Sequence, residues 1–246
     1  MEPIYRREFT VEDSMVDAFC RLRPSQILYL AQEIAGQHCD LLDLTYEHLA
    51  QKRLFWAVIR HRAQITRLPR LGEKLTAETW PLPTTRVAYP RSMVVYDEQG
   101  RECFRTISLW VLMDLDTRNM ILPGKSGVCV VGTVRGLELA SPGSLAPRLL
   151  GSRELRQVRY TDLDRNGHMN NTRYLDWIDD LLPSAFHKAH TVQGFTVCYL
   201  SEAKEGQELH LSWELGGEQE LFVEAVRQDP ENPAHQERVF AANILY

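Results

Sequence analysis

The chain has 246 residues, of which 44% are hydrophobic and 25% are charged, and its formal net charge is −5. This composition is typical of a globular protein with a substantial core, and the length suffices for one large or two small domains. The charge excludes the strongly basic character of most nucleic-acid-binding domains. The lack of an apolar run of eighteen residues excludes a membrane helix.

The cysteines and the N-terminus indicate where the chain acts. The five cysteines are widely spaced and form no CxxC pair, which favours reduced thiols in the cytoplasm and no metal site. The N-terminus predicts neither a secretory signal nor a transit peptide, because it carries acidic residues and no apolar region.

A helical pattern begins at Pro24 in the first half of the chain. Proline suits the first turn of a helix, and the apolar-face side chains that follow recur at spacings of three and four. These side chains are Ile27, Leu30, Ala31, Ile34, Ala35, His38, Leu41 and Leu42. A short second helix is predicted at about residues 45–52. Four β-rich runs follow at residues 54–65, 75–80, 87–96 and 102–114, with a hairpin turn at residues 97–100.

The second half repeats this order of elements. A strand is predicted at residues 155–160, and a helix from Met169 to about Leu182 ends before Pro183. Four further strands are predicted at residues 194–201, 208–214, 220–227 and 238–246. A long helix cannot be buried by itself, whereas a curved antiparallel sheet wrapped around it buries it well.

The predicted fold is therefore α+β, with two tandem hotdog domains, each a curved antiparallel sheet around a long central helix. The domains are expected at residues 1–125 and 151–246. Residues 126–150 between them are rich in Gly, Pro and Ser, which is typical of an interdomain linker.

The most informative segment is polar and lies just before the second long helix. Residues 162–171 hold two Asp, three Asn, one His and one Gly, more than a turn or a helix cap needs. Asp164, Asn166 and His168 are two residues apart, and in an extended segment their side chains would point to one side. A carboxylate, an amide and an imidazole placed together can hold a water, orient it and move its proton. The helix that follows would aim its N-terminus at the same spot.

Residues 162–177 resemble the signature of the acyl-ACP thioesterases, the fatty acyl carrier-protein hydrolases of plants and bacteria. Residues 30–38 and 91–118 also resemble this family, so the resemblance covers nearly the whole chain. It implies two hotdog domains in one chain. It also implies the release of a free fatty acid from acyl carrier protein (ACP).

The resemblance implies a catalytic set made of an Asp-x-Asn-x-His run in the second domain and a Glu further along the chain. These residues are Asp164, Asn166, His168 and Glu202. Glu205 is a weaker match for the Glu. Plant members carry a Cys directly after it, whereas this chain has Ala203 there, which argues against a thiol nucleophile. Cys198 is expected in the core.

The first half is the expected acyl-binding half, because no His follows Asp17 where the second half has its polar cluster. In the family the first domain houses the acyl chain. The candidate substrate-binding residues are Ile27, Leu30, Ala31, Ile34, Trp56, Asn170, Asn171 and Trp177. The four residues of the first helix are core residues by default, the tryptophans are candidates for lining an acyl tunnel, and the asparagines also support the turn.

Thioester hydrolysis needs a positioned water, a base and donors for the oxyanion, but no metal and no cofactor. Backbone N–H groups at the start of the helix predicted at Met169 would face the carbonyl oxygen. Asp164 or Glu202 would accept the proton of the water, directly or through His168. Asn166 would hold the water or the thioester oxygen. The residue pattern does not rank these roles.

Other functions remain open at this point. Acyl-CoA thioesterases of the single-hotdog type share a similar motif, although their chains are shorter, and a non-catalytic acyl-binding protein is a third hypothesis. We expect ACP as partner, no nucleic acid, no membrane span, and a monomer or homodimer. A loose basic set has two interpretations, a dock for the acidic ACP and ordinary solvated charge, of which we favour the second. This set is Arg60, Arg62, Arg67, Arg70 and Lys74.

Overall fold

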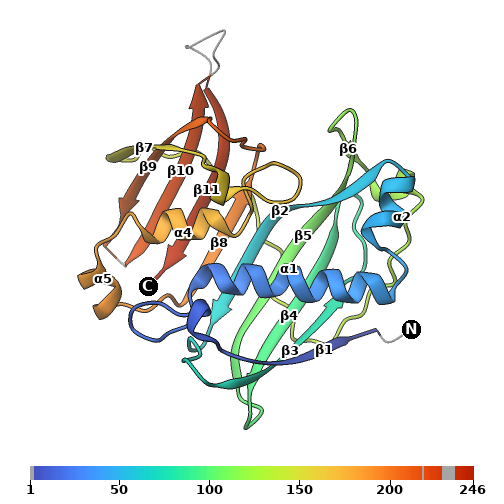
Figure 1. The fold of residues 1–246 in the computed structure, drawn as a ribbon, viewed down its shortest axis with the longest axis horizontal. Coiled ribbons are helices and arrows are strands. Elements are labelled where there is room, and N and C mark those ends of the chain that lie inside the picture. Colours follow the sequence, from blue (N-terminus) through green and yellow to red (C-terminus); the bar gives the residue numbers. More distant parts are fainter. Residues whose placement is uncertain (1–2, 218, 229–235) are drawn as a thin grey trace. The chain divides into compact units, whose positions relative to one another are not determined.

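Two units make up the chain, Met1–Pro142 and Gly143–Tyr246, which we call unit 1 and unit 2. The structure is a computed structural model that describes residues 3–217, 219–228 and 236–246. Within each unit a helix lies against one face of an antiparallel sheet (Figure 1), as the expected α+β hotdog fold requires. None of the helices in these residues is long and apolar enough to cross a membrane.

The sheet of unit 1 has the strand order β1-β3-β4-β5-β2, and the short β6 pairs with β5. The strands are β1 (Tyr5–Thr10), β2 (Leu54–Ile65), β3 (Lys74–Pro81), β4 (Tyr89–Asp97), β5 (Glu102–Asp114) and β6 (Met120–Ile121). The strands predicted at residues 54–65 and 102–114 have the predicted ends. The predicted hairpin is confirmed, because the N–H of Gly100 donates to the carbonyl of Asp97 at 2.9 Å. Gly100 has a φ of 73°, which glycine adopts without strain.

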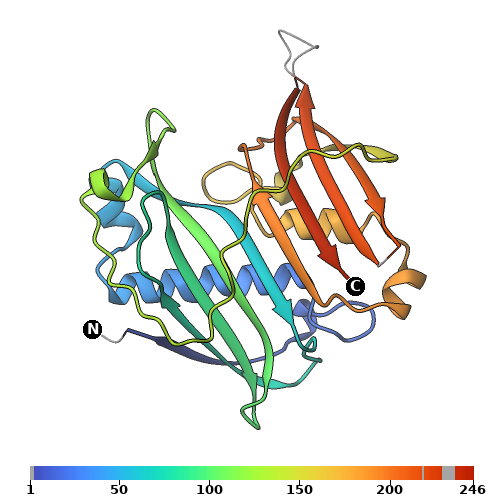
Figure 2. The same cartoon turned by 180° about the vertical axis from the view of Figure 1, so that it is seen from behind.

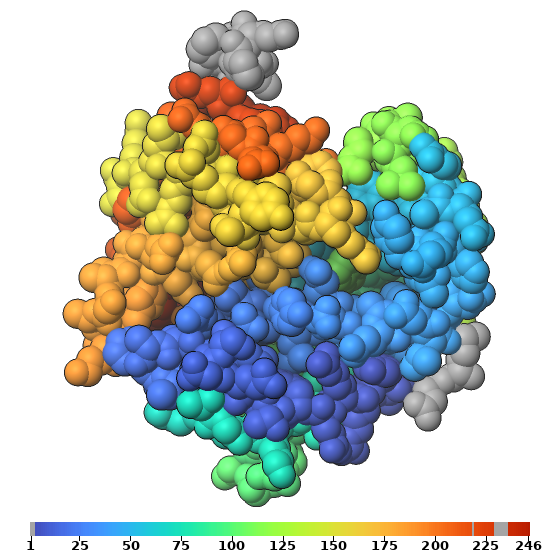
Figure 3. Space-filling model, in the orientation of Figure 1, coloured from blue at the N-terminus to red at the C-terminus, as the bar shows by residue number. Residues whose placement is uncertain are grey.

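The long helix α1 (Pro24–Leu41) covers one face of this sheet (Figure 1). Its predicted apolar face is buried from Ile27 to His38, with Ile27 and Ile34 at 0% exposure and Leu30 and Ala31 below 6%, whereas Leu41 at the end of the predicted face is exposed. Burying a side chain the size of Ile or Leu stabilises a fold by roughly 1.5–3 kcal/mol, so this face holds the helix on the sheet. The opposite side of α1 reaches the surface, where its segment is blue in Figure 3. The shorter helices of unit 1 are η1 (Asp13–Met15), α2 (Tyr46–Gln51) and α3 (Pro123–Ser126).

His38 of α1 packs inside unit 1, as predicted. It is 1% exposed, and its ring stacks on that of Tyr5 with a centroid distance of 5.9 Å. Nη1 of Arg91 on β4 lies 3.1 Å from Nδ1 of His38. The imidazole therefore joins α1 to the sheet.

Residues 127–142 of unit 1 contain no helix or strand and cross the sheet on the face opposite α1 (Figure 2). Arg105 of β5 donates to the carbonyl of Leu137 at 2.8 Å, and the indole of Trp80 donates to Glu138 at 3.1 Å. Gly132 runs so close to the chain at Pro83 that a Cβ would lie 2.1 Å from the Pro83 nitrogen. Only glycine fits at this crossing.

The sheet of unit 2 has the strand order β8-β11-β10-β9-β7. The strands are β7 (Ser152–Gln157), β8 (Gly194–Tyr199), β9 (Glu208–Leu215), β10 (Glu220–Gln228) and β11 (Gln236–Leu245). All five were predicted, although β7 begins and ends three residues earlier than expected. The order matches that of unit 1 when β7, β9, β10, β11 and β8 are set against β1, β3, β4, β5 and β2.

The helix of unit 2 is shorter than the one predicted at residues 169–182. The helical segments are η2 (Tyr160–Asp162), the seven-residue α4 (Arg173–Asp179) and α5 (Ser184–Ala189). The first predicted turn does not form, because Met169 pairs with Leu163 in a β-bridge and its N–H donates to the carbonyl of Ala203 at 2.8 Å. The ring of Tyr174 packs α4 on the sheet, with its centroid 4.6 Å from that of Phe240.

Candidate active site

Residues 163–169 form a tight turn rather than the extended segment predicted from the sequence. Leu163 and Met169 pair at its base, the N–H of Asp164 donates to the carbonyl of His168 at 2.8 Å, and Gly167 has a φ of 76°. The carboxylate of Asp164 closes the turn, since its Oδ1 accepts the N–H groups of Asn166 at 2.7 Å and of His168 at 3.3 Å. Asp side chains commonly bond to nearby backbone in this way. The extended conformation is therefore a wrong prediction.

The amide of Asn166 lies beside the carboxylate of Asp164. Its Nδ2 donates to Oδ2 of Asp164 at 3.3 Å. An ionised carboxylate can only accept, so this contact fixes which end of the amide faces Asp164. Asn166 is exposed, and the second N–H of its amide can donate to a ligand at the surface of the turn.

The turn brings His168 against a second segment of unit 2. His168 forms a β-bridge with Lys204, and the N–H of Met169 donates to the carbonyl of Ala203 at 2.8 Å. Between these contacts, Nε2 of His168 lies 3.3 Å from Oε2 of Glu202. The side chains are 15% and 39% exposed, so water can reach this acid–base pair.

The four residues expected to be catalytic thus form two contacts. His168 meets Glu202, and Asp164 meets Asn166. The carboxylate of Asp164 also accepts the backbone N–H of His168 at 3.3 Å. The weaker candidate Glu205 is exposed.

Cys198 and two backbone N–H groups before α4 are engaged in contacts within unit 2. The thiol of Cys198 is wholly buried and lies 3.6 Å from the carbonyl of Gly143, so the predicted core role is confirmed. Two of the backbone donors near this helix start are already used. Asn170 donates to Asp162 at 2.8 Å, and the N–H of Thr172 donates to Oδ1 of Asn170 at 3.0 Å. These two N–H groups at the helix start therefore already have acceptors within unit 2.

Two tyrosines that the sequence marked only as apolar or strand residues lie next to the turn. The hydroxyl of Tyr199 donates to the carbonyl of Asn171 at 3.0 Å, and the rings of Tyr174 and Tyr199 meet edge to face at 5.5 Å. Burial raises the pKa of both phenols, so both stay neutral. They give the turn an uncharged support.

The candidate substrate-binding residues fall in both units. Unit 1 contributes the buried face of α1 with Ile27, Leu30, Ala31 and Ile34, and Trp56 of β2. The ring of Trp56 meets that of Tyr89 edge on at 4.9 Å. Unit 2 contributes Asn170, Asn171 and the buried Trp177 of α4. Oδ1 of Asn170 accepts the hydroxyl of Thr172 at 3.0 Å, so Asn170 holds the start of α4.

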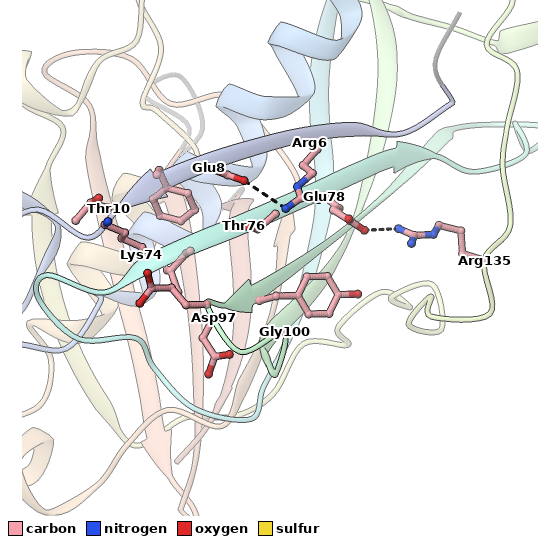
Figure 4. Close-up of a pocket in the computed structure, with 13 residues that line it drawn as sticks. Arg6, Glu8, Thr10, Lys74, Thr76, Glu78, Asp97, Gly100 and Arg135 are labelled. Carbon is pink, nitrogen blue, oxygen red and sulfur yellow. Dashed lines mark hydrogen bonds and ion pairs between the residues drawn. The ribbon is translucent and has the colours of Figure 1, made fainter.

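A pocket of about 850 Å³ lies on the strands β1, β3 and β4 of unit 1 (Figure 4). Its wall is charged, with ion pairs between Arg6 and Glu8 at 3.3 Å and between Arg135 and Glu78 at 2.7 Å. None of the candidate substrate-binding residues lines it. Among the described residues, no group of three or more His, Cys, Asp or Glu side chains is placed to hold a metal ion.

Unit 1 contains the same turn with different side chains. Oδ1 of Asp17 accepts the N–H groups of Phe19 at 2.8 Å and of Arg21 at 2.9 Å, as Asp164 does for Asn166 and His168. Arg21 bridges to Arg70 as His168 bridges to Lys204.

The segments that meet these turns also match. Val11 exchanges backbone hydrogen bonds with residues 72 and 73, and Val158 exchanges the same pair with residues 206 and 207. Leu68 lies four residues before residue 72, and Glu202 lies four residues before the equivalent residue 206. Leu68 therefore corresponds to Glu202. Arg21 therefore replaces His168, Leu68 replaces Glu202, and unit 1 lacks the acid–base pair at this place.

The basic set from the first half is not one free surface. Arg67 pairs with Glu73 at 2.7 Å and with Asp97 at 3.1 Å, and Arg60 donates to the carbonyl of Pro142 at 3.2 Å. Three members are exposed, namely Arg62, Arg70 and Lys74.

Two family models match the chain. The acyl-ACP thioesterase N-terminal domain matches residues 2–122, and the acyl-ACP thioesterase C-terminal domain matches residues 151–238. An oleoyl-acyl carrier protein thioesterase of Arabidopsis thaliana is 24% identical over 220 residues, which are 82% of this chain and 61% of that protein. A dodecanoyl-[acyl-carrier-protein] hydrolase of Cinnamomum camphora is 25% identical over 217 residues, which are 81% of this chain and 56% of that protein. The chain thus spans less than two thirds of the length of these curated relatives.

A solved structure confirms the fold. The crystal structure of an acyl-ACP thioesterase from Bacteroides thetaiotaomicron has a TM-score of 0.84 with this chain at 24% identity. The likeness covers 99% of this chain and 97% of that one.

Proposed function

The chain belongs to the acyl-ACP thioesterase family, and we propose that it hydrolyses the thioester of a fatty acyl-ACP and releases a free fatty acid and holo-ACP. The observation that carries this proposal is the 3.3 Å contact between Nε2 of His168 and Oε2 of Glu202. This pair is open to water, and His168 lies on the turn that also carries Asn166.

In the proposed reaction, a water molecule beside His168 and Glu202 attacks the carbonyl carbon of the thioester. The pair accepts a proton from the water as the C–O bond forms, and returns a proton to the sulfur as the C–S bond breaks. The imidazole and the carboxylate are 3.3 Å apart, so a proton can pass between them. A thiolate is a good leaving group, and the reaction needs no stronger acid.

The developing oxyanion needs a donor near the pair, and Asn166 is the residue we assign to it. One N–H of its Nδ2 is held by Asp164, and the other is available to the carbonyl oxygen. A donor that is oriented before the reaction loses little free energy in reorganisation as charge develops. Asn166 takes the place of the backbone donors first expected at the helix start.

Asp164 has a positioning role in this proposal and is not the base. Each of its carboxylate oxygens already accepts a hydrogen bond within the turn. Asp17 makes the same backbone contacts in unit 1, where no His follows it. The carboxylate of Asp164 thus sets the conformation that presents Asn166 and His168.

We assign residues 151–246 to the catalytic domain, residues 1–125 to the acyl-binding domain and residues 126–150 to the linker. The catalytic pair lies in the first of these ranges, and the buried apolar face of α1 lies in the second. The acyl-contacting residues proposed in unit 1 are Ile27, Leu30, Ala31, Ile34 and Trp56. Trp177, Asn170 and Asn171 are the corresponding proposals in unit 2. The indole N–H of Trp56 is buried without a partner in the described residues, which supports a site that binds a further group.

The partner we propose is ACP, which the names of the plant relatives give as their substrate carrier. The five cysteines are free, which supports the reducing cytoplasm as the site of action. One chain already holds two hotdog units, so a monomer or a homodimer is the proposed assembly.

The proposal is tested by incubating the purified chain with matched acyl-ACPs and acyl-CoAs from octanoyl to octadecanoyl. Thiol release gives the rate, and mass spectrometry identifies the freed acids. We expect faster release from acyl-ACP than from the matched acyl-CoA. Faster release from acyl-CoA would replace ACP by coenzyme A as the carrier. Tight acyl-ACP binding with no thiol release would make the chain a binding protein.

A further inference from the structure

Arg227 of β10 contacts three acceptors in the loop that carries Glu202. Its guanidinium donates to the main-chain oxygen of Glu202 at 2.9 Å, to Oε1 of Gln207 at 2.6 Å and to Oγ of Ser201 at 3.2 Å. It also pairs with Glu237. The side chain is 19% exposed, and a guanidinium presents its donors in a rigid planar fork. Arg227 therefore holds both ends of this loop against the strand.

Gln207 extends this contact to the other member of the catalytic pair. The same Oε1 that accepts from Arg227 also accepts the N–H of Lys204 at 2.9 Å. Lys204 is the β-bridge partner of His168. Arg227 thus acts directly on the backbone of Glu202 and, through Gln207 and Lys204, on the segment next to His168.

Unit 1 has an acid at the position that matches Arg227. In unit 1, Tyr96 of β4 pairs with Thr76, and in unit 2, Val226 of β10 pairs with His210. The next residue on each strand is Asp97 in unit 1 and Arg227 in unit 2. The strand therefore offers a carboxylate to the loop in one unit and a guanidinium in the other.

The loop of unit 1 carries the arginine instead. Arg67 donates to the two carboxylate oxygens of Glu73 at 3.0 and 2.7 Å and to Asp97 at 3.1 Å. Glu73 in turn accepts the N–H of Arg70 at 2.7 Å, as Gln207 accepts that of Lys204. When the two units are aligned on the backbone bonds of Val11 and Val158, Ser201 corresponds to Arg67 and Gln207 corresponds to Glu73.

This exchange matters for the charge around Glu202. An arginine on the loop itself, at position 201, would compete with His168 for the carboxylate of Glu202. Arg227 comes from the strand and takes the main-chain oxygen of Glu202. The carboxylate then remains in contact with the imidazole.

We propose that Arg227 is a positioning residue of the active site, which fixes the Glu202 loop and thereby holds the Glu202 carboxylate against His168. The proposal rests on the assignment of this pair as the catalytic groups. It adds a residue outside the sequence motif, on a different strand, to the residues on which turnover depends.

The test compares Arg227→Gln with Arg67→Gln, which removes the equivalent clamp from unit 1, and with Arg227→Lys. Hydrogen exchange followed by mass spectrometry reports on the loops at residues 200–207 and 66–73. NMR of the imidazole reports on the titration of His168. Steady-state kinetics on acyl-ACP over a range of pH gives kcat, KM and the pH profile, and thermal melting confirms that each variant is folded.

In Arg227→Gln we expect faster exchange at residues 200–207, a shifted midpoint of the His168 titration and a shifted pH profile. We also expect kcat to fall by about tenfold with little change in KM. Arg227→Lys should lower kcat less than Arg227→Gln does. Arg67→Gln should loosen residues 66–73 and lower the melting temperature without moving the His168 titration or kcat.

The proposal is overturned if the His168 titration is the same in the wild type and in Arg227→Gln, or if Arg67→Gln moves it equally. The exchange and titration measurements need no turnover. A wild-type chain that released no thiol would therefore contradict the proposed function and still leave the role of Arg227 decided.

Discussion

The turn at residues 17–21 and the turn at residues 164–168 share their backbone hydrogen bonds and differ in their side chains. In both, the N–H of the Asp donates to the carbonyl four residues on at 2.8 Å, and Oδ1 accepts two N–H groups in return. A residue with positive φ stands at the same place, as Cys20 in unit 1 and Gly167 in unit 2. The difference is the group at the end of the turn, an arginine paired with Asp17 in one case and an imidazole facing Glu202 in the other.

This comparison separates the residues that build the site from the residues that perform the reaction. What both units contain, such as the Asp, is explained by the turn. What only unit 2 contains is the set Asn166, His168 and Glu202, which is the set our proposal gives chemical roles. The predictions below use unit 1 as the control within the same molecule.

The largest effect is expected from removing the catalytic pair. His168→Ala and Glu202→Gln should each lower kcat for acyl-ACP by about 100-fold or more, the usual range for loss of a general acid or base. The matched changes Arg21→Ala and Leu68→Gln should leave kcat within about twofold, provided that melting curves show a folded protein. Normal turnover by purified His168→Ala would remove this residue from the mechanism.

A smaller and more selective effect is expected at Asp164. Asp164→Ala leaves the N–H groups of Asn166 and His168 without their acceptor, and each lost hydrogen bond costs about 0.5–1.5 kcal/mol. Turnover should fall by about tenfold because the turn loosens. Asp164→Asn keeps one acceptor oxygen for these N–H groups but loses the acceptor for the Asn166 amide, so it should retain more activity than Asp164→Ala.

If Asp164 were the base, the Asn variant would be as inactive as the Ala variant, and kinetics of the two proteins side by side would reveal it. Asp17→Asn and Asp17→Ala provide the matched pair in unit 1. Asp17→Ala should lower the melting temperature more than Asp17→Asn does, and neither change should alter kcat.

A change of specificity rather than rate is expected at Ala31, which is 5% exposed on the face of α1 that meets the sheet. Ala31→Phe should shorten the preferred acyl chain and lower the ratio of hexadecanoyl to octanoyl release by about tenfold, a range set by pocket contacts with a few methylenes. Ile178→Phe makes the comparable insertion on α4 and should not change that ratio. Product profiles measured by mass spectrometry decide the matter, and an unchanged profile in Ala31→Phe would place the acyl chain elsewhere.

The smallest effect concerns stability and pH at the clamp of unit 1. Burial would raise the pKa of Asp97, but hydrogen bonds from the backbone of Arg101 and from the side chains of Arg67 and Arg101 lower it to about 2. The pKa of Asp97 in the folded state lies below the ordinary value of 3.8. The ionised carboxylate therefore contributes its full stabilisation of unit 1 at pH values above 3.8. The stabilisation is lost as the pH falls through about 2.

Asp97→Asn should therefore lower the melting temperature near neutral pH, and its difference from the wild type should shrink below the ordinary pKa. Asp116→Asn, which removes the exposed partner of Arg53, serves as the control and should change little at any pH. A difference between Asp97→Asn and the wild type that stayed constant down to about pH 2 would contradict the pairing of Asp97.

Much of the fold was readable from the sequence because its signals are local. Pro24 and the apolar spacing after it define α1, whose predicted apolar face is buried as far as His38, and β2 and β5 begin and end where the β-rich runs do. These elements bury side chains at regular intervals, so the pattern and the structure obey the same period.

The errors lie where long-range backbone contacts and polar side chains set the conformation of the chain before the helix. The apolar pattern after Met169 predicts a helix of three turns or more. In the structure, the N–H groups of Met169 and Asn170 donate to carbonyls outside the helix, and Oδ1 of Asn170 accepts the N–H of Thr172. Asp164 likewise turns a segment that the spacing alone would leave extended. Polar residues near helix starts favour such alternatives.

The motif identified four candidate catalytic residues, and the structure brings two of them, His168 and Glu202, into contact across unit 2. Arg227 could not be found in this way. Its contact with the Glu202 loop depends on the register of β10 against β9 and on the loop conformation, neither of which is encoded in neighbouring residues.

The central claim is that a water molecule beside His168 and Glu202 attacks the thioester directly. A single turnover of acyl-ACP by excess wild-type chain in ¹⁸O-water tests it most directly. The account predicts that the fatty acid released in this first turnover carries one ¹⁸O atom and that the carboxylate of Glu202 carries none. A first-turnover acid without the label, or label in the peptide that contains Glu202, would show that the acyl group passes through the protein and would contradict the account.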